Sequence, residues 1–454
     1  MLTNAELEKR KRLSGDNMQP YYHILPFHDC FILYLNGTMK YVVLTPEEHQ
    51  VCLSGGENSV LTRLLSENEE MFHQVNELHL GPVGLTLNVA NTCNLCCSYC
   101  YAHGGNYNSQ NTLMSEDTAI RAVRQFAEYF GELKRIKFFG GEPFLNPKVI
   151  RAVCETCVEL RNKGIIKELP DFTTVTNGTI INSELIDLIK MYDIGVTVSY
   201  DGNSKMQNIL RPFVSGQESN DILLENIKLL QTETANKQPS SVEVTYTQVH
   251  AQEGISVEQC YNNVKHLFGI EDIKITPVSC VPTDKHHLTN IDSFQNAIIS
   301  GYHRNPRDIK VVEKAYRLHQ ILTLKKRSER IFCGAGINRF SVGADGNVYP
   351  CYLFTNDSEF CLGNIWDTNF SLEKYEATRF RLMEYNRLTS SECNVCWASS
   401  FCFGCRGNNR LLTGDADTPS EDFCQMLKDV AENILYCMAE AGEIKALNDL
   451  EMER

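Results

Sequence analysis

The sequence lacks long hydrophobic runs, an excess of positive charge, and internal repeats or low-complexity tracts. None of its apolar stretches approaches the roughly 20 residues of a membrane-spanning helix, and its start, MLTNAELEKRKRLSGDN, contains no apolar core of a signal peptide. Its 43 lysines and arginines stand against 57 aspartates and glutamates, which gives a net charge of -14. These absences predict a cytoplasmic protein that neither spans a membrane nor holds nucleic acid by nonspecific charge attraction.

Cysteine, by contrast, is abundant. The 454 residues include 19 cysteines, in a chain that is long enough to bury a sizeable core and that starts without an export signal. Disulfide frameworks mainly stabilise small secreted domains. Metal binding or redox chemistry is therefore the first hypothesis for these cysteines.

The first segment, residues 1–80, is predicted to form a small α+β domain. The runs FILYLNG and MKYVVL alternate on either side of Asn36 and Gly37, which is typical of a β-hairpin. Pro46 indicates a helix start, residues 59–65 predict a second short helix, and Gly55-Gly56 predicts the break between them.

The middle segment, residues 81–300, is predicted to form an α/β domain. A helix is expected after Ser115, a suitable N-cap, because apolar residues from Ile120 to Phe130 recur every three or four positions. Strands that alternate with such helices favour a parallel sheet with helical crossovers. The β-rich runs are residues 84–89, 136–139, 172–176, 195–200, 242–247 and 273–278.

The last segment, residues 301–454, differs from the others in composition and in hydrophobic periodicity. Turns, glycines and cysteines are frequent, and core-forming periodicity weakens between Phe332 and Cys424. Metal ligation can replace some of the hydrophobic burial in such a segment. The sequence therefore predicts a separate, metal-nucleated domain.

Three cysteines follow the first strand of the middle segment. Cys93, Cys97 and Cys100 have the spacing C-x3-C-x2-C, and Cys96 is too close to Cys97 to bind the same metal easily. Three soft thiolates on one tight loop suit a cubic iron–sulfur cluster with one iron left open. A zinc site or a chance cluster of cysteines is the alternative.

This loop resembles the signature of radical S-adenosylmethionine (radical SAM) enzymes, including the aromatic Tyr99 before the last cysteine. The resemblance implies a partial (β/α)6 TIM-type barrel. It also implies that SAM chelates the open iron through its amino and carboxylate groups. One electron, from a donor such as flavodoxin or ferredoxin, then produces a 5'-deoxyadenosyl radical that abstracts hydrogen from the substrate.

Motifs at later strand ends extend the resemblance, because barrel enzymes place their chemistry at the C-terminal ends of the strands. Gly140, Gly141 and Glu142 match the family motif that holds the SAM amino group, and Arg211 matches the residue that pairs with its carboxylate. Plain turns, a capped strand end and a solvated arginine are the alternatives. The cofactor-binding residues implied by the resemblance are Tyr99, Gly140, Gly141, Glu142, Asn177, Ser199 and Arg211.

Seven cysteines in the last segment closely resemble the SPASM extension of radical SAM peptide-modifying enzymes. That extension holds two auxiliary 4Fe-4S clusters, which would make three clusters in all. The chain departs from the usual pattern because only Phe403 and Gly404 separate the fifth and sixth cysteines, and structural zinc knuckles are the alternative. The seven are Cys333, Cys351, Cys393, Cys396, Cys402, Cys405 and Cys424.

The resemblance also implies which cysteines share a cluster. Cys393, Cys396, Cys402 and Cys424 would hold the second auxiliary cluster, and Cys333, Cys351 and Cys405 the first. Some relatives supply a fourth ligand to the first cluster where this chain has Arg339. The first cluster would therefore have an open iron for a substrate thiolate, unless Cys361 or Cys280 completes it. Four other cysteines are predicted to be core residues: Cys154, Cys157, Cys260 and Cys437.

Small features distinguish the reactions that this scaffold supports. Sulfatase-maturating relatives carry an aspartate base where this chain has Tyr352, which weighs against that activity. The run Thr245-Tyr246-Thr247 with His250 resembles thioether-forming maturases, although Tyr246 and His250 would also suit a core aromatic and a loop histidine. We therefore expect a maturase that joins cysteine sulfur to a carbon of another residue. The alternatives are a sulfatase-maturating enzyme, a carbon–carbon crosslinking maturase and, from another class, a noncatalytic iron–sulfur scaffold or zinc-binding adaptor.

The expected substrate is a ribosomally made precursor peptide with a leader and a cysteine-containing core. Residues 1–80 would form a winged-helix-like domain that binds the leader as an extra strand at a sheet edge. Their two cysteines, Cys30 and Cys52, lack metal-ligand spacing, so we expect no chemistry there. A simple packing extension is the alternative.

Overall fold

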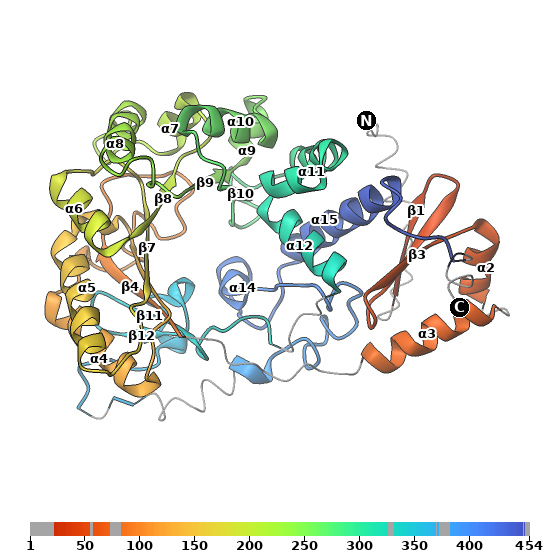
Figure 1. Ribbon diagram of the computed structural model, residues 1–454, viewed down its shortest axis with the longest axis horizontal. Helices are drawn as coiled ribbons and strands as arrows, with labels where there is room; N and C mark the ends of the chain where they lie inside the picture. The colour runs from red at the N-terminus through yellow and green to blue at the C-terminus, as the bar shows by residue number, and fades with distance from the viewer. Residues whose placement is uncertain are drawn as a thin grey trace.

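The computed structural model describes residues 22–54, 58–72, 83–325, 331–368, 370–371, 382–447 and 449. The predicted break at Gly55-Gly56 and the proposed boundary at residue 80 lie outside these residues. A small sheet with two helices lies at one end of the chain fold, and a large curved sheet lies at the other (Figure 1). Three helices lie between them: α11 (Asp292–Arg304), α12 (Glu313–Leu324) and α15 (Glu421–Glu440).

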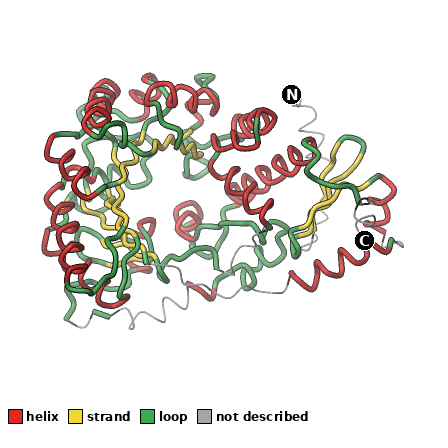
Figure 2. The backbone as a smooth tube through the Cα atoms, in the orientation of Figure 1, coloured by secondary structure: helices red, strands yellow, loops and turns green. Residues whose placement is uncertain are grey.

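A strongly curved parallel sheet forms the large unit. Six of its strands run in the order β10-β9-β8-β7-β6-β4, all parallel, and all six were predicted. The helices cover its outer side, so that the sheet forms a partial barrel (Figure 2). The α/β barrel prediction is therefore confirmed. The strands are β4 (Gly84–Asn91), β6 (Arg135–Gly140), β7 (Asp171–Thr176), β8 (Gly195–Ser199), β9 (Ser241–Tyr246) and β10 (Ile273–Pro277), and β5 (Thr112–Leu113) pairs with β4.

The helix after Ser115 shows why these segments fold locally. The Ser115 side chain accepts a hydrogen bond from the Thr118 backbone, and Gly131 ends the helix in the left-handed conformation. The apolar face, including Val123 and Phe126, is buried against the sheet. The helices of this part are α4 (Glu116–Phe130), α5 (Pro147–Asn162), α6 (Ser183–Tyr192), α7 (Ser204–Leu210), α8 (Asn220–Glu233), α9 (Gln248–Gln252) and α10 (Val257–Phe268), with the 3-10 turn η1 (Pro143–Leu145).

The last segment contributes to the same sheet. Strand β11 (Arg339–Val342) pairs in parallel with β4, with Arg339 opposite Gly84, and β12 (Val348–Tyr349) pairs with β11. A strand from the cysteine-rich segment therefore covers the edge of β4 that the barrel would leave open. No pattern in the sequence indicated this strand.

The rest of the last segment combines packed helices with irregular cysteine-rich loops. A division of the chain at residue 300 would cut α11, so we place the proposed division in the loop before it. Residues of α12 and α15, such as Leu318 and Ile434, belong to the main hydrophobic core. The elements are α11 (Asp292–Arg304), η2 (Pro306–Val311), α12 (Glu313–Leu324), η3 (Tyr352–Phe354), η4 (Ser358–Phe360), α14 (Arg406–Thr413) and α15 (Glu421–Glu440). Within the described residues, no helix is long and apolar enough to cross a membrane.

The small N-terminal unit contains the predicted hairpin with a different turn. Leu35 pairs with Lys40, so the loop has four residues, and Met39 rather than Gly37 adopts a positive φ of 54°. A further strand, β1, was not predicted, and the second helix continues beyond residue 65. The elements are β1 (Tyr22–Phe27), β2 (Cys30–Leu35), β3 (Lys40–Leu44), α2 (Pro46–Ser54) and α3 (Ser59–Phe72), and the strands form an antiparallel sheet.

Candidate functional site

A cavity of about 410 Å³ opens at the C-terminal ends of the barrel strands. Its wall includes Tyr352, Leu353 and Asn408 from the last segment. The cavity is therefore bounded by both the barrel and the cysteine-rich loops, and its size suits a cofactor-sized ligand. The predicted residues on its wall are Cys93, Cys97, Cys100, Tyr99, Gly140, Gly141, Asn177, Ser199 and Arg211.

Two glycines dock the loop after β6 against the start of the cysteine loop. The Gly141 N–H donates to Ala90 at 2.7 Å, and the Glu142 N–H donates to Thr92 at 3.0 Å. A Cβ atom on Gly140 or Gly141 would lie 2.2 Å from the Ala90 or Thr92 carbonyl oxygen, respectively. Only glycine allows this close approach of two backbones.

Glu142 does not lie on the cavity wall, in contrast to its predicted contact with SAM. Its carboxylate is fully buried and accepts hydrogen bonds from the Asn177 N–H at 2.7 Å, the Phe144 N–H at 3.0 Å and the Thr176 hydroxyl at 2.8 Å. Burial raises the pKa of Glu142 to about 7, although these hydrogen bonds oppose the shift. The carboxylate therefore joins the ends of β6 and β7 from behind the wall.

Burial disfavours the ionised form of two thiols in the cysteine loop. Burial raises the pKa of Cys93 to about 12, while hydrogen bonds from the Leu95 N–H (3.4 Å) and the Asn177 amide (3.6 Å) oppose the shift. Burial raises the pKa of Cys97 to about 11, and Arg211 opposes it. Bound iron would favour the thiolates, so this donor set fits an iron–sulfur cluster.

A buried carboxylate that sequence reasoning left without a role, Asp201, organises the other side of the loop. It accepts from Arg211 Nε at 3.1 Å and from the Tyr99 hydroxyl at 2.7 Å. The Arg211 guanidinium lies 5.4 Å from the centre of the Tyr99 ring, and its Nη1 lies 3.9 Å from Cys97 Sγ. Arg211 is therefore not a solvated arginine. Asp201 follows Ser199 and Tyr200 at the end of a predicted strand. This position at a strand end was the sequence feature that could have identified Asp201 as a site residue.

His286 was also missed, because no sequence motif surrounds it. Its side chain is nearly fully buried, and its Nε2 lies 2.9 Å from the Ser98 hydroxyl of the cysteine loop. Its Nδ1 lies 2.7 Å from Asp284. The loop after β10 therefore contacts the cysteine loop at Ser98, between the predicted ligands Cys97 and Cys100.

Tyr246 and His250 belong to the core rather than to the cavity wall. Tyr246 stacks on His250 with ring centres 4.8 Å apart, and its hydroxyl donates to the Ile255 carbonyl. His250 is fully buried and caps α9 through Thr247. Of this run, only Thr245 lines the cavity. The core interpretation of Tyr246 and His250 is therefore the one that the structure supports.

The cysteines predicted to hold the auxiliary clusters lie near other members of their own predicted set. Burial raises the pKa of Cys351, and the nearby Cys405 and Cys333 thiols raise it further. Burial raises the pKa of Cys402 to about 12, with further contributions from Cys396, Cys424 and Cys393. Within the described residues, no three His, Cys, Asp or Glu side chains are arranged to hold a single metal ion. The assignment of ligands to clusters stays a prediction.

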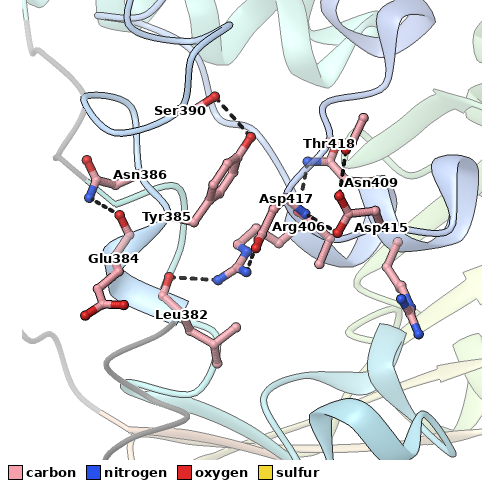
Figure 3. A network of polar contacts seen from close by, with 12 residues as sticks. Leu382, Glu384, Tyr385, Asn386, Ser390, Arg406, Asn409, Asp415, Asp417 and Thr418 are labelled. Carbon is pink, nitrogen blue, oxygen red and sulfur yellow. Dashed lines mark hydrogen bonds and ion pairs between the residues drawn. The ribbon is translucent and has the colours of Figure 1, made fainter.

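A polar network joins the loops that carry these two sets (Figure 3). Arg406, next to Cys405, donates to the Leu382 carbonyl at 2.9 Å and forms an ion pair with Asp417. Its guanidinium lies 5.3 Å from the centre of the Tyr385 ring, whose hydroxyl donates to Ser390 at 3.0 Å. Ser390 Oγ in turn accepts from the Cys393 N–H at 3.2 Å. The network fixes one set of thiols relative to the other.

The two candidate fourth ligands lie in different surroundings. The Cys361 thiol faces the carbonyl of Gly363, two residues away, at 3.7 Å. Cys280 lines a second cavity of about 260 Å³. The predicted core cysteines Cys154, Cys157, Cys260 and Cys437 are all buried, as expected.

Two family models match the parts of the chain that form this site. The model of the radical SAM superfamily matches residues 87–241, and the model of the SPASM iron–sulfur cluster-binding domain matches residues 333–397. The chain contains a radical SAM domain and a SPASM domain. The first match runs from within β4 to the first residue of β9, and the second begins at Cys333 and ends just after Cys396.

Curated relatives match large parts of the chain at low identity. The chain is 29% identical to an uncharacterized protein of Methanocaldococcus jannaschii over 64% of this chain and 91% of that protein. It is 25% identical to the radical SAM cyclopropyl synthase TigE of Paramaledivibacter caminithermalis, over 80% and 76% of the two chains. It is 24% identical to a cysteine-type anaerobic sulfatase-maturating enzyme of Clostridium perfringens, over 78% and 96%.

Solved structures share the fold of this radical SAM/SPASM protein. The AdoMet-bound structure of anSMEcpe superposes with a TM-score of 0.65 at 21% identity, over 80% of this chain and 96% of that one. Streptococcus suis SuiB bound to its precursor peptide SuiA superposes with a TM-score of 0.53 at 15% identity, over 89% and 99%. At these identities the likeness concerns the fold alone.

Proposed function

We propose that this radical SAM/SPASM protein is a peptide maturase that forms thioether bonds between a cysteine sulfur and a carbon of another residue. The observation that carries the proposal is the shared cavity: the loop with Cys93, Cys97 and Cys100 faces Tyr352 and Asn408 of the SPASM part. A peptide in this cavity would meet the predicted SAM site and the auxiliary cysteine loops together.

The proposed cofactors are SAM and three 4Fe-4S clusters. Cys93, Cys97 and Cys100 would hold the SAM-binding cluster, and the two SPASM sets would hold the auxiliary clusters. When bound, SAM and its cluster supply the radical that abstracts hydrogen from the peptide. The chain's own contribution is orientation: Arg211 is held by Asp201 for a carboxylate, and Asn177 donates to Cys93. Electrons would come from a flavodoxin or ferredoxin.

The proposed partner is a ribosomally made precursor peptide. SuiB, which shares the fold, has been crystallised with the precursor peptide SuiA. The N-terminal sheet of this chain has two edge strands, β1 and β3, and we expect the leader to bind at such an edge. The bound leader would then hold the core segment of the peptide close to the cavity, which raises the effective concentration of the core segment there.

Tyr352 favours thioether formation over formylglycine formation. Its ring lies on the cavity wall, with its centre 4.7 Å from that of Phe139. Burial raises the pKa of its hydroxyl, so Tyr352 is a neutral phenol at physiological pH and is a poor proton acceptor. The likeness to sulfatase-maturating enzymes nevertheless makes sulfatase maturation the second candidate, and the relation to a cyclopropyl synthase keeps carbon–carbon bond formation as a third.

Mass spectrometry of a treated peptide separates these reactions. The reconstituted enzyme, SAM and a reductant would be incubated with cysteine-containing peptides encoded near its gene and with a sulfatase peptide. Thioether formation removes two hydrogens and protects the cysteine from alkylation. Formylglycine formation removes the sulfur and leaves an aldehyde, whereas a carbon–carbon link removes two hydrogens but leaves the thiol open to alkylation. Either of the last two products would refute the thioether proposal.

A further inference from the structure

The chain after α15 returns to the small N-terminal sheet and lies beside its edge strand β3 (Figure 1). The Val43 N–H donates to the Lys445 carbonyl at 3.0 Å, and the Leu447 N–H donates to the Val43 carbonyl at 3.1 Å. Val43 and Ala446 form an isolated parallel bridge. A segment about 400 positions away along the sequence, here named the edge segment (residues 445–447), thus acts as a short added strand.

The edge segment also fills an apolar site. Leu447 is 1% exposed and belongs to the hydrophobic cluster of the N-terminal unit, together with Leu44 of β3 and Leu61 and Leu64 of α3. This cluster is separate from the main core of the barrel. Leu447 therefore inserts between the small sheet and its helix as a side chain of a docked peptide would.

The edge continues beyond the single position that is bridged. Val43 directs its N–H and carbonyl away from β2, and backbone direction alternates along a strand, so Tyr41 directs its own groups to the same side. A longer extended peptide would gain these further hydrogen bonds. The edge segment thus pairs with the outward-facing backbone groups of Val43, one position of the strand.

We propose that the outer edge of β3 is a docking site for an extended peptide with an aliphatic side chain, and that the edge segment is its built-in occupant. The inference rests on the proposed peptide-modifying function, and it adds that a substrate peptide must displace this segment. Because the segment is tethered, its effective concentration at the edge is high, on the order of millimolar for a short link. A free peptide whose contacts are no better than those of the edge segment would therefore compete poorly with it. Only a peptide that makes more hydrogen bonds or fills the apolar site better would displace the segment.

Binding of a labelled probe to two forms of the chain tests this inference. The probe is a fluorescein-labelled peptide of residues 445–449, Lys-Ala-Leu-Asn-Asp, and the variant ends after Ile444. This variant keeps the hydrogen bond between Tyr302 and Glu443 and the buried Ile444. We expect the probe to bind the variant at least about 10-fold more tightly than the full chain, because the tethered competitor is gone.

Two further measurements make the result decisive. A probe with aspartate in place of leucine should not bind the variant, and the full chain with Leu447→Asp should bind the original probe more tightly than the unchanged chain does. Circular dichroism checks that both altered chains remain folded. Equal binding by all folded forms would overturn the proposal, as would a shortened chain that dimerises through the edge and ignores the probe.

The probe experiment needs no cofactor, so it fails independently of the proposed function. A chain that binds the probe but modifies no peptide contradicts the maturase proposal alone. If the chain makes thioethers but its shortened form binds the probe no more tightly than the full chain does, only the present inference is contradicted.

Discussion

At the scale of single residues, the buried pair of Asp201 and Arg211 is the feature that most directly shapes the site. Asp201 is fully buried and the Arg211 side chain is 10% exposed, so neither charge is stabilised much by water. Removing one charge of such a pair leaves the other uncompensated. The pair also holds Tyr99 and contacts Cys97.

We expect Asp201→Asn to destabilise the chain by about 3 kcal/mol and to weaken SAM binding. The change keeps the side-chain shape but leaves the Arg211 charge unpaired. Asp193→Asn is the matched control, because Asp193 is exposed at the end of α6 in a left-handed conformation that asparagine tolerates. Urea unfolding and equilibrium dialysis with SAM measure the two effects; equal behaviour of both variants would contradict the role of the pair.

Glu142 predicts a pH dependence with a definite sign. Its pKa is raised from 4.5 to about 7 in the folded chain, so the folded chain binds more protons than the unfolded chain between these values. The stability that this group contributes is therefore present at low pH and is lost as the pH rises to about 7. The destabilisation caused by Glu142→Ala should shrink by up to about 3 kcal/mol between pH 5 and pH 8.

Urea unfolding of both chains across this pH range checks the expectation, with the exposed Glu132→Ala as control. Other titrating groups are common to both chains and cancel in the difference. A cost that grows toward pH 8 would show that the carboxylate is charged at low pH.

Replacing Cys93, Cys97 and Cys100 together by alanine tests the assignment of the SAM-cleaving cluster. Thiolates are the only ligands in this loop that are soft and close enough to hold iron. We expect 5'-deoxyadenosine formation to cease while about two-thirds of the iron remains, because two of three clusters are untouched. Chromatography of the nucleoside and iron analysis measure both quantities, and survival of SAM cleavage would refute the assignment.

At the scale of elements, the loops at the strand ends work as interlocked turns rather than as separate binding loops. The loop after β6 packs its glycines against the residues that precede Cys93, and the turn after β7 donates to Cys93 itself. The position of the cysteine loop is therefore set by its neighbours. A small displacement of one turn should therefore shift the positions of the cysteine thiols.

We expect Gly141→Ala to reduce iron loading of the SAM-cleaving cluster severalfold, because the new methyl group would lie 2.2 Å from the Thr92 carbonyl and 3.0 Å from the Cys93 N–H nitrogen. Gly84→Ala is a suitable control in the same sheet, since nothing lies within 4 Å of its added methyl group. Iron content and the absorption of the reconstituted cluster give the readout. Full loading of the Gly141 variant would mean that the turns do not constrain each other.

At the scale of the whole molecule, the N-terminal unit is attached to the auxiliary cysteine loop. Asn36, fully buried in the hairpin turn, donates to the Cys396 carbonyl at 3.2 Å and to Ser399 at 3.0 Å, and it accepts from the Ser400 N–H at 3.0 Å. His23 stacks on Trp397 with ring centres 3.9 Å apart. Deleting the whole unit would therefore disturb more than peptide binding.

We expect Asn36→Ala to lower the iron content of the second auxiliary cluster, because the loop between Cys396 and Cys402 loses three hydrogen bonds. The change is best made in the variant that lacks Cys93, Cys97 and Cys100, where only auxiliary iron remains. The exposed Gln50→Ala on α2 controls for a general effect on the N-terminal unit. Unchanged iron in the Asn36 variant would show that the unit serves peptide recognition only.

The six barrel strands, the helix after Ser115 and nine residues of the cavity wall could be predicted from the sequence alone. These depend on hydrophobic period, capping and spacing, which act over a few residues and are readable along the chain. The partners of Asp201 and Glu142, the placement of Tyr246 in the core and the strand β11 beside β4 were decided by the tertiary structure. So was the contact of Asn36 with Ser400, which joins positions 364 residues apart. Such pairings depend on which surfaces the whole chain buries together, and no local pattern records that choice.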